Sequence, residues 1–169
     1  PILKDNGIIL SQTTTTQNSK PDAVRRGFAS IGPVKPIDYV YRWPGGLRPL
    51  DEFSAAANGV GVIATVPEID GVVRRIPLLV SIAGNLFPSL SLETIRVLGN
   101  DKSFQIKTSE AGIEFVRAPA VPPIATDERG RIWLSWNTKF QRIDATEIDN
   151  RDRKSTRLNS SHVALSRMP

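Results

Sequence analysis

The chain has 169 residues, of which 40% are hydrophobic and 23% charged, and its formal net charge is +5 at pH 7. This composition is that of a globular protein with one domain and its own core, which excludes an intrinsically disordered chain. Cysteine is absent, which excludes disulfides, thiolate nucleophiles and cysteine-based metal sites.

The N-terminal part predicts a strand and then a long loop. Residues 7–16 (GIILSQTTTT) hold three consecutive apolar residues followed by β-branched threonines, which predicts a strand buried on both faces at a central position of a sheet. Residues 32–49 hold four prolines with Tyr39, Tyr41 and Trp43 between them. This segment predicts an extended surface loop with aromatic anchors.

The next segments predict a short helix and two strands. Residues 49–58 begin with proline, have two acids in the first turn and are followed by glycine, which predicts a short helix. Residues 60–66 and 72–82 are rich in β-branched residues and predict strands. Asp70 and Gly71 predict the tight turn between them, because glycine tolerates the positive φ that such turns need.

The second half predicts the clearest helix of the chain and further strands. Residues 88–98 carry apolar side chains at helical spacing and are followed by a glycine, which predicts a helix capped at its C-terminus. Residues 103–107 and 112–117 predict a hairpin, and residues 131–136 predict a last strand. Residues 145–149 predict the start of a final helix. Together the elements predict a single α/β domain with a mixed sheet and packed helices.

The C-terminal segment 152–169 resembles a translated sequencing adapter. Residues 152–162 read DRKSTRLNSSH, which matches the translation of a common short-read adapter, and residues 165–169 fit the next adapter segment in frame. The domain is therefore expected to cover residues 1–150, and residues 151–169 are expected to be an artefactual, disordered tail.

Leaving out this tail changes the charge and the available chemistry. Segment 152–169 holds four of the 22 basic residues and one of the 17 acidic residues, so the net charge of the remaining chain is +2. It also holds His162, the one histidine of the sequence. Neither a nucleic-acid partner nor histidine-based catalysis or metal binding is therefore expected.

Asp70, Arg74 and Arg75 form the sharpest candidate site. A guanidinium presents a planar fork to a carboxylate or phosphate, so the paired arginines suggest an anionic ligand. Adjacent residues of a strand point to opposite faces, so one of the two arginines is expected to face a given pocket. The structural alternative is the more common situation: Asp70 and Gly71 make the turn, and an arginine is buried in an ion pair with Asp70 or Glu93.

Ser89 and Trp43 complete the set of candidate ligand-binding residues. Ser89 precedes the helix of residues 88–98, where serine commonly caps free N–H groups and where an anion could bind instead. Trp43 could line a ligand cleft, although packing of the proline-rich loop against the sheet is the more frequent role. The sequence contains no nucleophile–base set, no metal-ligand spacing and no glycine-rich phosphate loop, so we expect no catalytic residue, metal or cofactor.

Four blocks of sequence resemble the second type of CHASE domain, the cyclase/histidine-kinase-associated sensory extracellular domain. The blocks are GVGVIATVPEIDGVVRRIPLL at 59–79, GNLFPSLSLETIR at 84–96, IATDERGRIWLSW at 124–136 and IDATEI at 143–148. The resemblance covers roughly residues 7–149. It implies an extracytoplasmic ligand-sensing domain of a bacterial membrane receptor, with a nucleotide cyclase, histidine kinase, Ser/Thr kinase or cyclic-dinucleotide module as output.

The resemblance also implies a location and partners. The domain is expected on the periplasmic or extracellular face of the cytoplasmic membrane, in a chain truncated at both ends. The sequence has no run of about 18 apolar residues, so membrane attachment is expected only through flanking helices outside it. The expected partner is an unidentified small molecule or partner domain, and the full-length receptor is expected to be a homodimer. Two alternatives stay open: a structural dimerisation module without a soluble ligand, and a soluble enzyme of unknown type.

Overall fold

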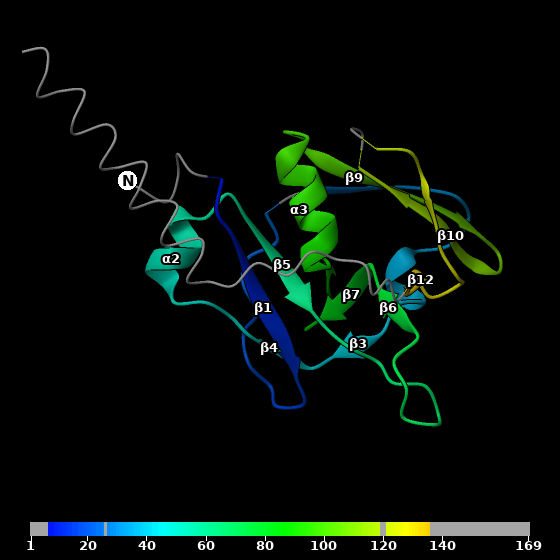
Figure 1. Ribbon diagram of the computed structural model, residues 1–169, viewed down its shortest axis with the longest axis horizontal. Coiled ribbons are helices and arrows are strands. Elements are labelled where there is room, and N and C mark those ends of the chain that lie inside the picture. The colour runs from blue at the N-terminus through cyan, green and yellow to red at the C-terminus, as the bar shows by residue number, and fades with distance from the viewer. Residues whose placement is uncertain (1–6, 26, 119–120, 136–169) are drawn as a thin grey trace, which may run out of the picture. The chain divides into compact units, whose positions relative to one another are not determined.

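The computed structural model describes residues 7–25, 27–118 and 121–135 (Figure 1). The chain divides into two compact units, Pro1–Leu134 and Ser135–Pro169, and all described elements belong to the first. In chain order they are β1 (Ile9–Thr15), β2 (Gly27–Ile31), the 3-10 helix η1 (Pro36–Asp38), β3 (Arg42–Trp43), β4 (Gly45–Leu47), α2 (Asp51–Ala56), β5 (Gly59–Ile63), β6 (Arg75–Pro77), β7 (Leu79–Ile82), β8 (Asn85–Pro88), α3 (Leu90–Leu98), β9 (Ser103–Ser109), β10 (Gly112–Arg117), β11 (Ile124–Ala125) and β12 (Arg131–Trp133).

The described strands form four small sheets, three of them with both parallel and antiparallel pairs, and together with the helices they confirm the predicted α/β class. Their orders are β4-β1-β5, β11-β10-β9-β2, β12-β6 and β3-β7-β8. The predicted helices at residues 49–58 and 88–98 are present as α2 and α3, and the predicted hairpin is the antiparallel pair β9 and β10. The predictions for residues 136, 145–149 and 151–169 lie outside the described residues.

Strand β1 occupies the centre of its sheet, as predicted, but it is not buried on both faces. It runs parallel to β5 and antiparallel to β4, and Gln12 is its one buried residue. Thr13 lies in register between Leu47 and Ile63, and all three side chains are exposed. The prediction of two-sided burial is wrong because no described element covers this end of the sheet.

The two strands predicted on either side of the Asp70–Gly71 turn do not pair with each other. Strand β5 pairs with β1, and the predicted second strand is divided into β6 and β7, which belong to different sheets. Pro77 has no N–H to continue a ladder, and the next N–H, that of Leu78, donates to the carbonyl of Gly130 instead. The turn therefore forms, but it joins strands of separate sheets.

The proline-rich segment 32–49 is more structured than predicted, since it contains η1, β3 and β4. Strand β4 fits beside the loop after β1 because a Cβ at Gly45 would overlap the backbone of Gln17 and Ser19. Strands β2 and β8 were also not predicted. Each is short and pairs with a partner distant in sequence or through a turn without a strong signal.

Helix α3 lies directly against β5, where the strand carries two glycines (Figure 1). A Cβ at Gly61 would overlap the backbone of Leu90, and a Cβ at Gly59 would overlap the carboxylate of Glu93. The helix places Leu92 in the main core cluster together with residues of β7, β9 and β10. The close contact of helix and strand therefore positions the core.

Glu93 and Arg96 form a buried ion pair inside this contact. Their side chains are 2% and 3% exposed, and the guanidinium binds the carboxylate through two hydrogen bonds of 2.8 and 2.7 Å. Arg96 also donates to the carbonyl of Asp101 at 2.7 Å. Removing one partner of such a pair leaves a buried charge and typically costs about 3–5 kcal/mol.

We expect Gly61→Ala and Gly59→Ala to destabilise the domain by about 1–3 kcal/mol, because the added methyl group overpacks the contact with α3. Urea unfolding of the chain measures the free energy. Gly27→Ala is the matched control, since a Cβ at this strand glycine meets no atom within 4 Å. It should change stability by less than about 0.5 kcal/mol. Equal stability of the Gly61→Ala and Gly27→Ala proteins would show that α3 is not seated as described.

Candidate functional site

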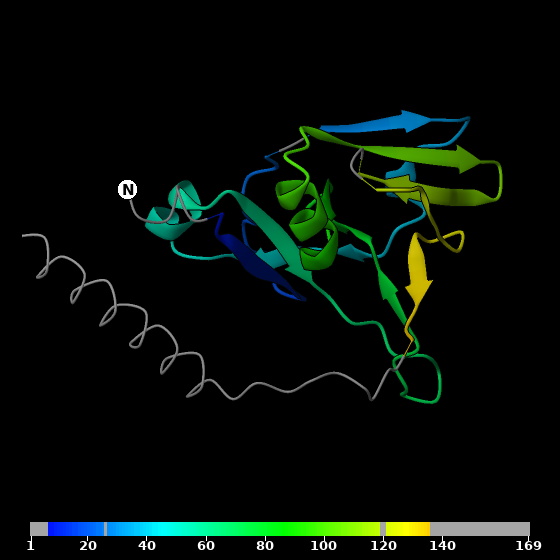
Figure 2. The same cartoon turned by 45° about the horizontal axis from the view of Figure 1, so that its top comes forward.

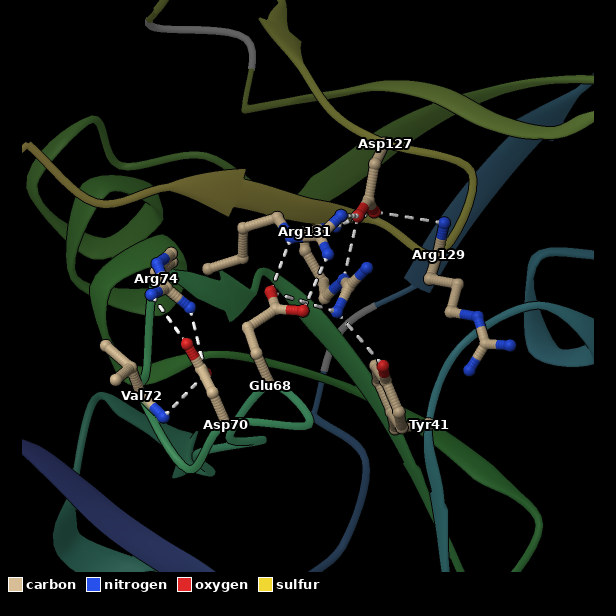
Figure 3. A network of polar contacts seen from close by, with 9 residues as sticks. Tyr41, Glu68, Asp70, Val72, Arg74, Asp127, Arg129 and Arg131 are labelled. Carbon is tan, nitrogen blue, oxygen red and sulfur yellow. Dashed lines mark hydrogen bonds and ion pairs between the residues drawn. The ribbon is translucent and has the colours of Figure 1, made fainter.

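Asp70 and Arg74 meet within the turn between β5 and β6. The N–H of Gly71 donates to the carbonyl of Glu68 at 2.9 Å, and Gly71 has a φ of 80°, which glycine adopts without strain. The carboxylate of Asp70 accepts two hydrogen bonds from Arg74, of 2.9 and 2.7 Å, and one from the N–H of Val72 at 3.1 Å (Figure 3). The hydrogen bonds from Arg74, and then that from Val72, lower the pKa of Asp70 to about 2.

Arg75 binds two other carboxylates, those of Glu68 and Asp127. Its guanidinium binds Glu68 through two hydrogen bonds of 2.8 and 2.9 Å and Asp127 through a third of 3.0 Å. Its carbon Cζ lies 5.0 Å from the ring centre of Trp133, which is a cation–π distance. The hydrogen bonds from Arg75 lower the pKa of Glu68, and those to Glu68 raise the pKa of Arg75.

Asp127 is the centre of this second set. One of its oxygens accepts the backbone N–H groups of Arg129 and Arg131, at 3.1 and 2.9 Å, and the other accepts Nε of Arg131 at 2.7 Å. Arg131 is buried and donates also to the hydroxyl of Tyr41 at 3.1 Å (Figure 3). We call Glu68, Arg75, Asp127 and Arg131 the arginine–carboxylate cluster. It fastens the turn before β6 to strand β12.

Of the five candidate residues, Asp70, Arg74 and Arg75 lie near one another at the turn before β6. Ser89 and Trp43 lie elsewhere in the fold. Ser89 caps α3, since its Oγ accepts the N–H of Leu92 at 3.2 Å. Trp43 packs against the second core cluster, which contains Val62 and Ile82. It also lines a shallow surface pocket with Ile37, Asp38, Arg42, Ser81 and Gly84.

The partners of the two arginines match the structural alternative in part. Arg74 pairs with Asp70, as that alternative states, but the pair is exposed, at 44% and 53% of the two side chains. Glu93, the other suggested partner, binds Arg96 instead. The geometry leaves ligand binding by Arg74 or Arg75 as a prediction and adds the condition that a ligand must compete with these carboxylates.

Glu68, Asp127, Arg131 and Tyr41 were not identified from the sequence as parts of one site. A signal was available for one pair, because Asp precedes Arg by four residues at 22–26, 38–42, 70–74, 127–131 and 149–153. The three of these pairs that lie wholly within the described residues, 38–42, 70–74 and 127–131, form salt bridges. The contacts of Arg75 with Asp127 and of Arg131 with Tyr41 span 52 and 90 residues, and no local pattern predicts them.

Comparisons with known proteins identify the family. A model of the CHASE2 domain matches residues 6–163, a range that extends past residue 150 into the adapter-like segment. No curated protein and no solved structure matches the chain. The chain belongs to the CHASE2 family, whose members are extracellular sensory domains of signalling receptors. Such a domain is a sensor and not a catalytic unit.

Two further findings concern the described residues. No helix among them is long and apolar enough to cross a membrane. No group of three or more His, Cys, Asp or Glu side chains in that part of the chain is arranged to hold a metal ion.

We expect the carboxyl group of Asp70 to titrate near pH 2 in the folded protein, below its ordinary value of 3.8. A lowered pKa means that the contribution of the pair to stability is fully present above pH 3.8 and is lost as the pH falls through about 2. Carbon-13 NMR of the aspartate side chains measures this titration. Arg74→Met should return the pKa of Asp70 toward 3.8, and Arg42→Met, which breaks the similarly spaced pair with Asp38, should not. A pKa of Asp70 that is unchanged in the Arg74→Met protein would contradict the assignment.

Proposed function

We propose that this chain is the extracytoplasmic input domain of a bacterial membrane-bound receptor, located on the periplasmic or extracellular face of the cytoplasmic membrane. The output is a nucleotide cyclase, a histidine kinase or a Ser/Thr kinase module, and the domain is attached to it through flanking membrane helices. The observation that carries this proposal is the CHASE2 match over residues 6–163. A sensory extracellular domain has no role without a segment that crosses the membrane to an output module.

We expect the complete gene to encode membrane-spanning helices and an output module next to this domain. Sequencing the source DNA beyond both ends of the chain provides the test, and it also determines whether genomic DNA encodes DRKSTRLNSSH. A gene without any membrane-spanning segment would contradict the receptor proposal and would favour a soluble protein.

We further propose that the domain binds a small anionic ligand at Arg74. We choose Arg74 over Arg75 because a ligand at either arginine must displace the carboxylates that the arginine already binds. Arg74 is 44% exposed and holds one exposed carboxylate, and water solvates both groups when such an exposed pair separates. Arg75 is 22% exposed and holds two carboxylates. An incoming anion therefore exchanges with Asp70 at Arg74 at a smaller cost.

This exchange gives the ligand a way to change the protein. A ligand shifts a conformational equilibrium only when it binds one state better than the other. The paired state has Asp70 on Arg74, and the ligand-bound state has the anion in its place and the carboxylate of Asp70 released. The turn before β6 is the element that differs between these two states.

We expect inorganic phosphate or succinate, at constant ionic strength, to raise the thermal unfolding midpoint of the chain and to give a saturable signal in calorimetry. Arg74→Ala should abolish the signal because it removes the fork that binds the anion. Asp70→Asn should strengthen binding, since it removes the competing charge while the turn can still form.

Arg42→Ala is the matched control, because Arg42 belongs to another exposed pair with the same spacing. It should leave the midpoint shift unchanged. Binding that is undiminished in the Arg74→Ala protein would exclude this site, and undiminished binding in the Arg75→Ala protein as well would exclude an anion site at either arginine.

A further inference from the structure

Strand β2 forms one edge of the four-stranded sheet. Its sequence is GFASI, and it pairs in parallel with β9 along one side only within the described residues. It lies along the outer margin of that sheet, as the blue strand at the top of Figure 2. Four of its five residues are exposed, and Ile31 is 65% exposed. Phe28 is the exception, because its ring stacks on Phe104 at 5.3 Å between centroids.

The other described sheet edges are short or protected, and β2 is neither. Strands β3, β4, β6, β11 and β12 have two or three residues each, and β8 ends in a proline. Strand β5 has five residues, but its second side is bridged to Ser89 and contacts α3. Natural edges avoid further pairing by short length, charges, proline or cover. Strand β2 has five residues, no charge, no proline and no described cover.

We propose that β2 pairs antiparallel with β2 of a second copy of this chain, so that the two four-stranded sheets become continuous. A dimer with twofold symmetry needs a surface that complements itself. With the axis at Ala29, the strand meets this condition: Ala29 faces its own copy, Gly27 faces Ile31, and Phe28 faces Ser30. The centre carries a small side chain, each Ile31 is opposite a glycine, and no like charges face each other.

The size of the contact indicates a weak dimer in solution. Five paired residues per chain bury far less surface than the roughly 1,200–2,000 Å² of a stable protein interface. Tethering two copies to one membrane raises their effective concentration into the range of about a millimolar, at which a weak contact is occupied. This inference does not rest on the ligand proposal, because assembly is measured without any ligand.

Oxidative cross-linking tests both the partner and the register. The sequence has no cysteine, so one substitution introduces the one thiol of the chain. Residues directly opposite each other in an antiparallel pair have Cα atoms about 4.5–5.5 Å apart, which a disulfide can bridge. The Ala29→Cys protein should therefore form a disulfide dimer at least about tenfold faster than the Ile31→Cys protein, whose thiols lie four positions apart along the pair.

A mixture of the Gly27→Cys and Ile31→Cys proteins should cross-link as a heterodimer, because these positions face each other in the proposed register. Ser11→Cys, an exposed position on the central strand β1, provides the background rate. Cross-linking of the Ala29→Cys protein at the Ser11→Cys rate would overturn the proposal. Faster cross-linking of the Ile31→Cys protein than of the Ala29→Cys protein would overturn the register.

Sedimentation velocity of the cysteine-free chain gives an independent test. We expect a monomer–dimer equilibrium between micromolar and submillimolar concentration. Ala29→Lys should raise the dissociation constant about fivefold to tenfold, since it places two like charges opposite each other, and circular dichroism checks that this variant is folded. An equimolar mixture with the Ala29→Glu protein should restore association. A chain that stays monomeric over the whole range, or a dimer that Ala29→Lys leaves unchanged, would overturn the proposal.

Discussion

The contact of α3 with β5 is the constraint on which the rest of the described structure depends. Gly61 lets the backbone of Leu90 approach the strand, and Gly59 makes room for the carboxylate of Glu93. At this distance Leu92 reaches the core cluster shared by β7, β9 and β10. A helix held farther out by one Cβ would withdraw Leu92 from that cluster and separate the buried pair from its partner carbonyl groups. The two glycines therefore determine how the helix and several of the sheets share one core.

The two kinds of ion pair in this domain have different consequences for function. Glu93 and Arg96 are almost fully buried, so the pair is held in place by the cost of leaving either charge alone. Asp70 and Arg74 are about half exposed, and water can solvate both groups when they separate. A sensor needs contacts that fix its fold and contacts that a ligand can replace. Because it is buried, the Glu93–Arg96 pair fixes the fold. Because it is exposed, the Asp70–Arg74 pair is the better candidate for replacement by a ligand.

Local signals in the sequence predicted local structure well and long-range pairing poorly. The Asp70–Gly71 turn, the serine cap of α3 and the β9–β10 hairpin each depend on neighbouring residues, and each is present. The strands at 60–66 and 72–82 are adjacent in sequence, but they pair with β1, β12 and β3, which no local pattern identifies; the pairing of β7 with the next strand, β8, is local. The same reason explains the site: the sequence indicated the paired arginines, whereas the carboxylate of Asp127 comes from 52 residues beyond Arg75.

The position of Arg74 connects the proposed ligand site with the last described strand. Its side chain holds Asp70, while its carbonyl accepts the N–H of Leu134 at 2.8 Å, one residue after β12 ends. Arg75 pairs with Trp133 across the two-stranded sheet and binds Asp127, which holds Arg131 at the start of β12. Arg74 therefore joins the pair with Asp70 to the backbone of Leu134, one residue beyond β12. Asp127 and Arg131 hold the start of β12, so under the ligand proposal the exchange of Asp70 for a ligand would act first on the backbone bonded to Leu134.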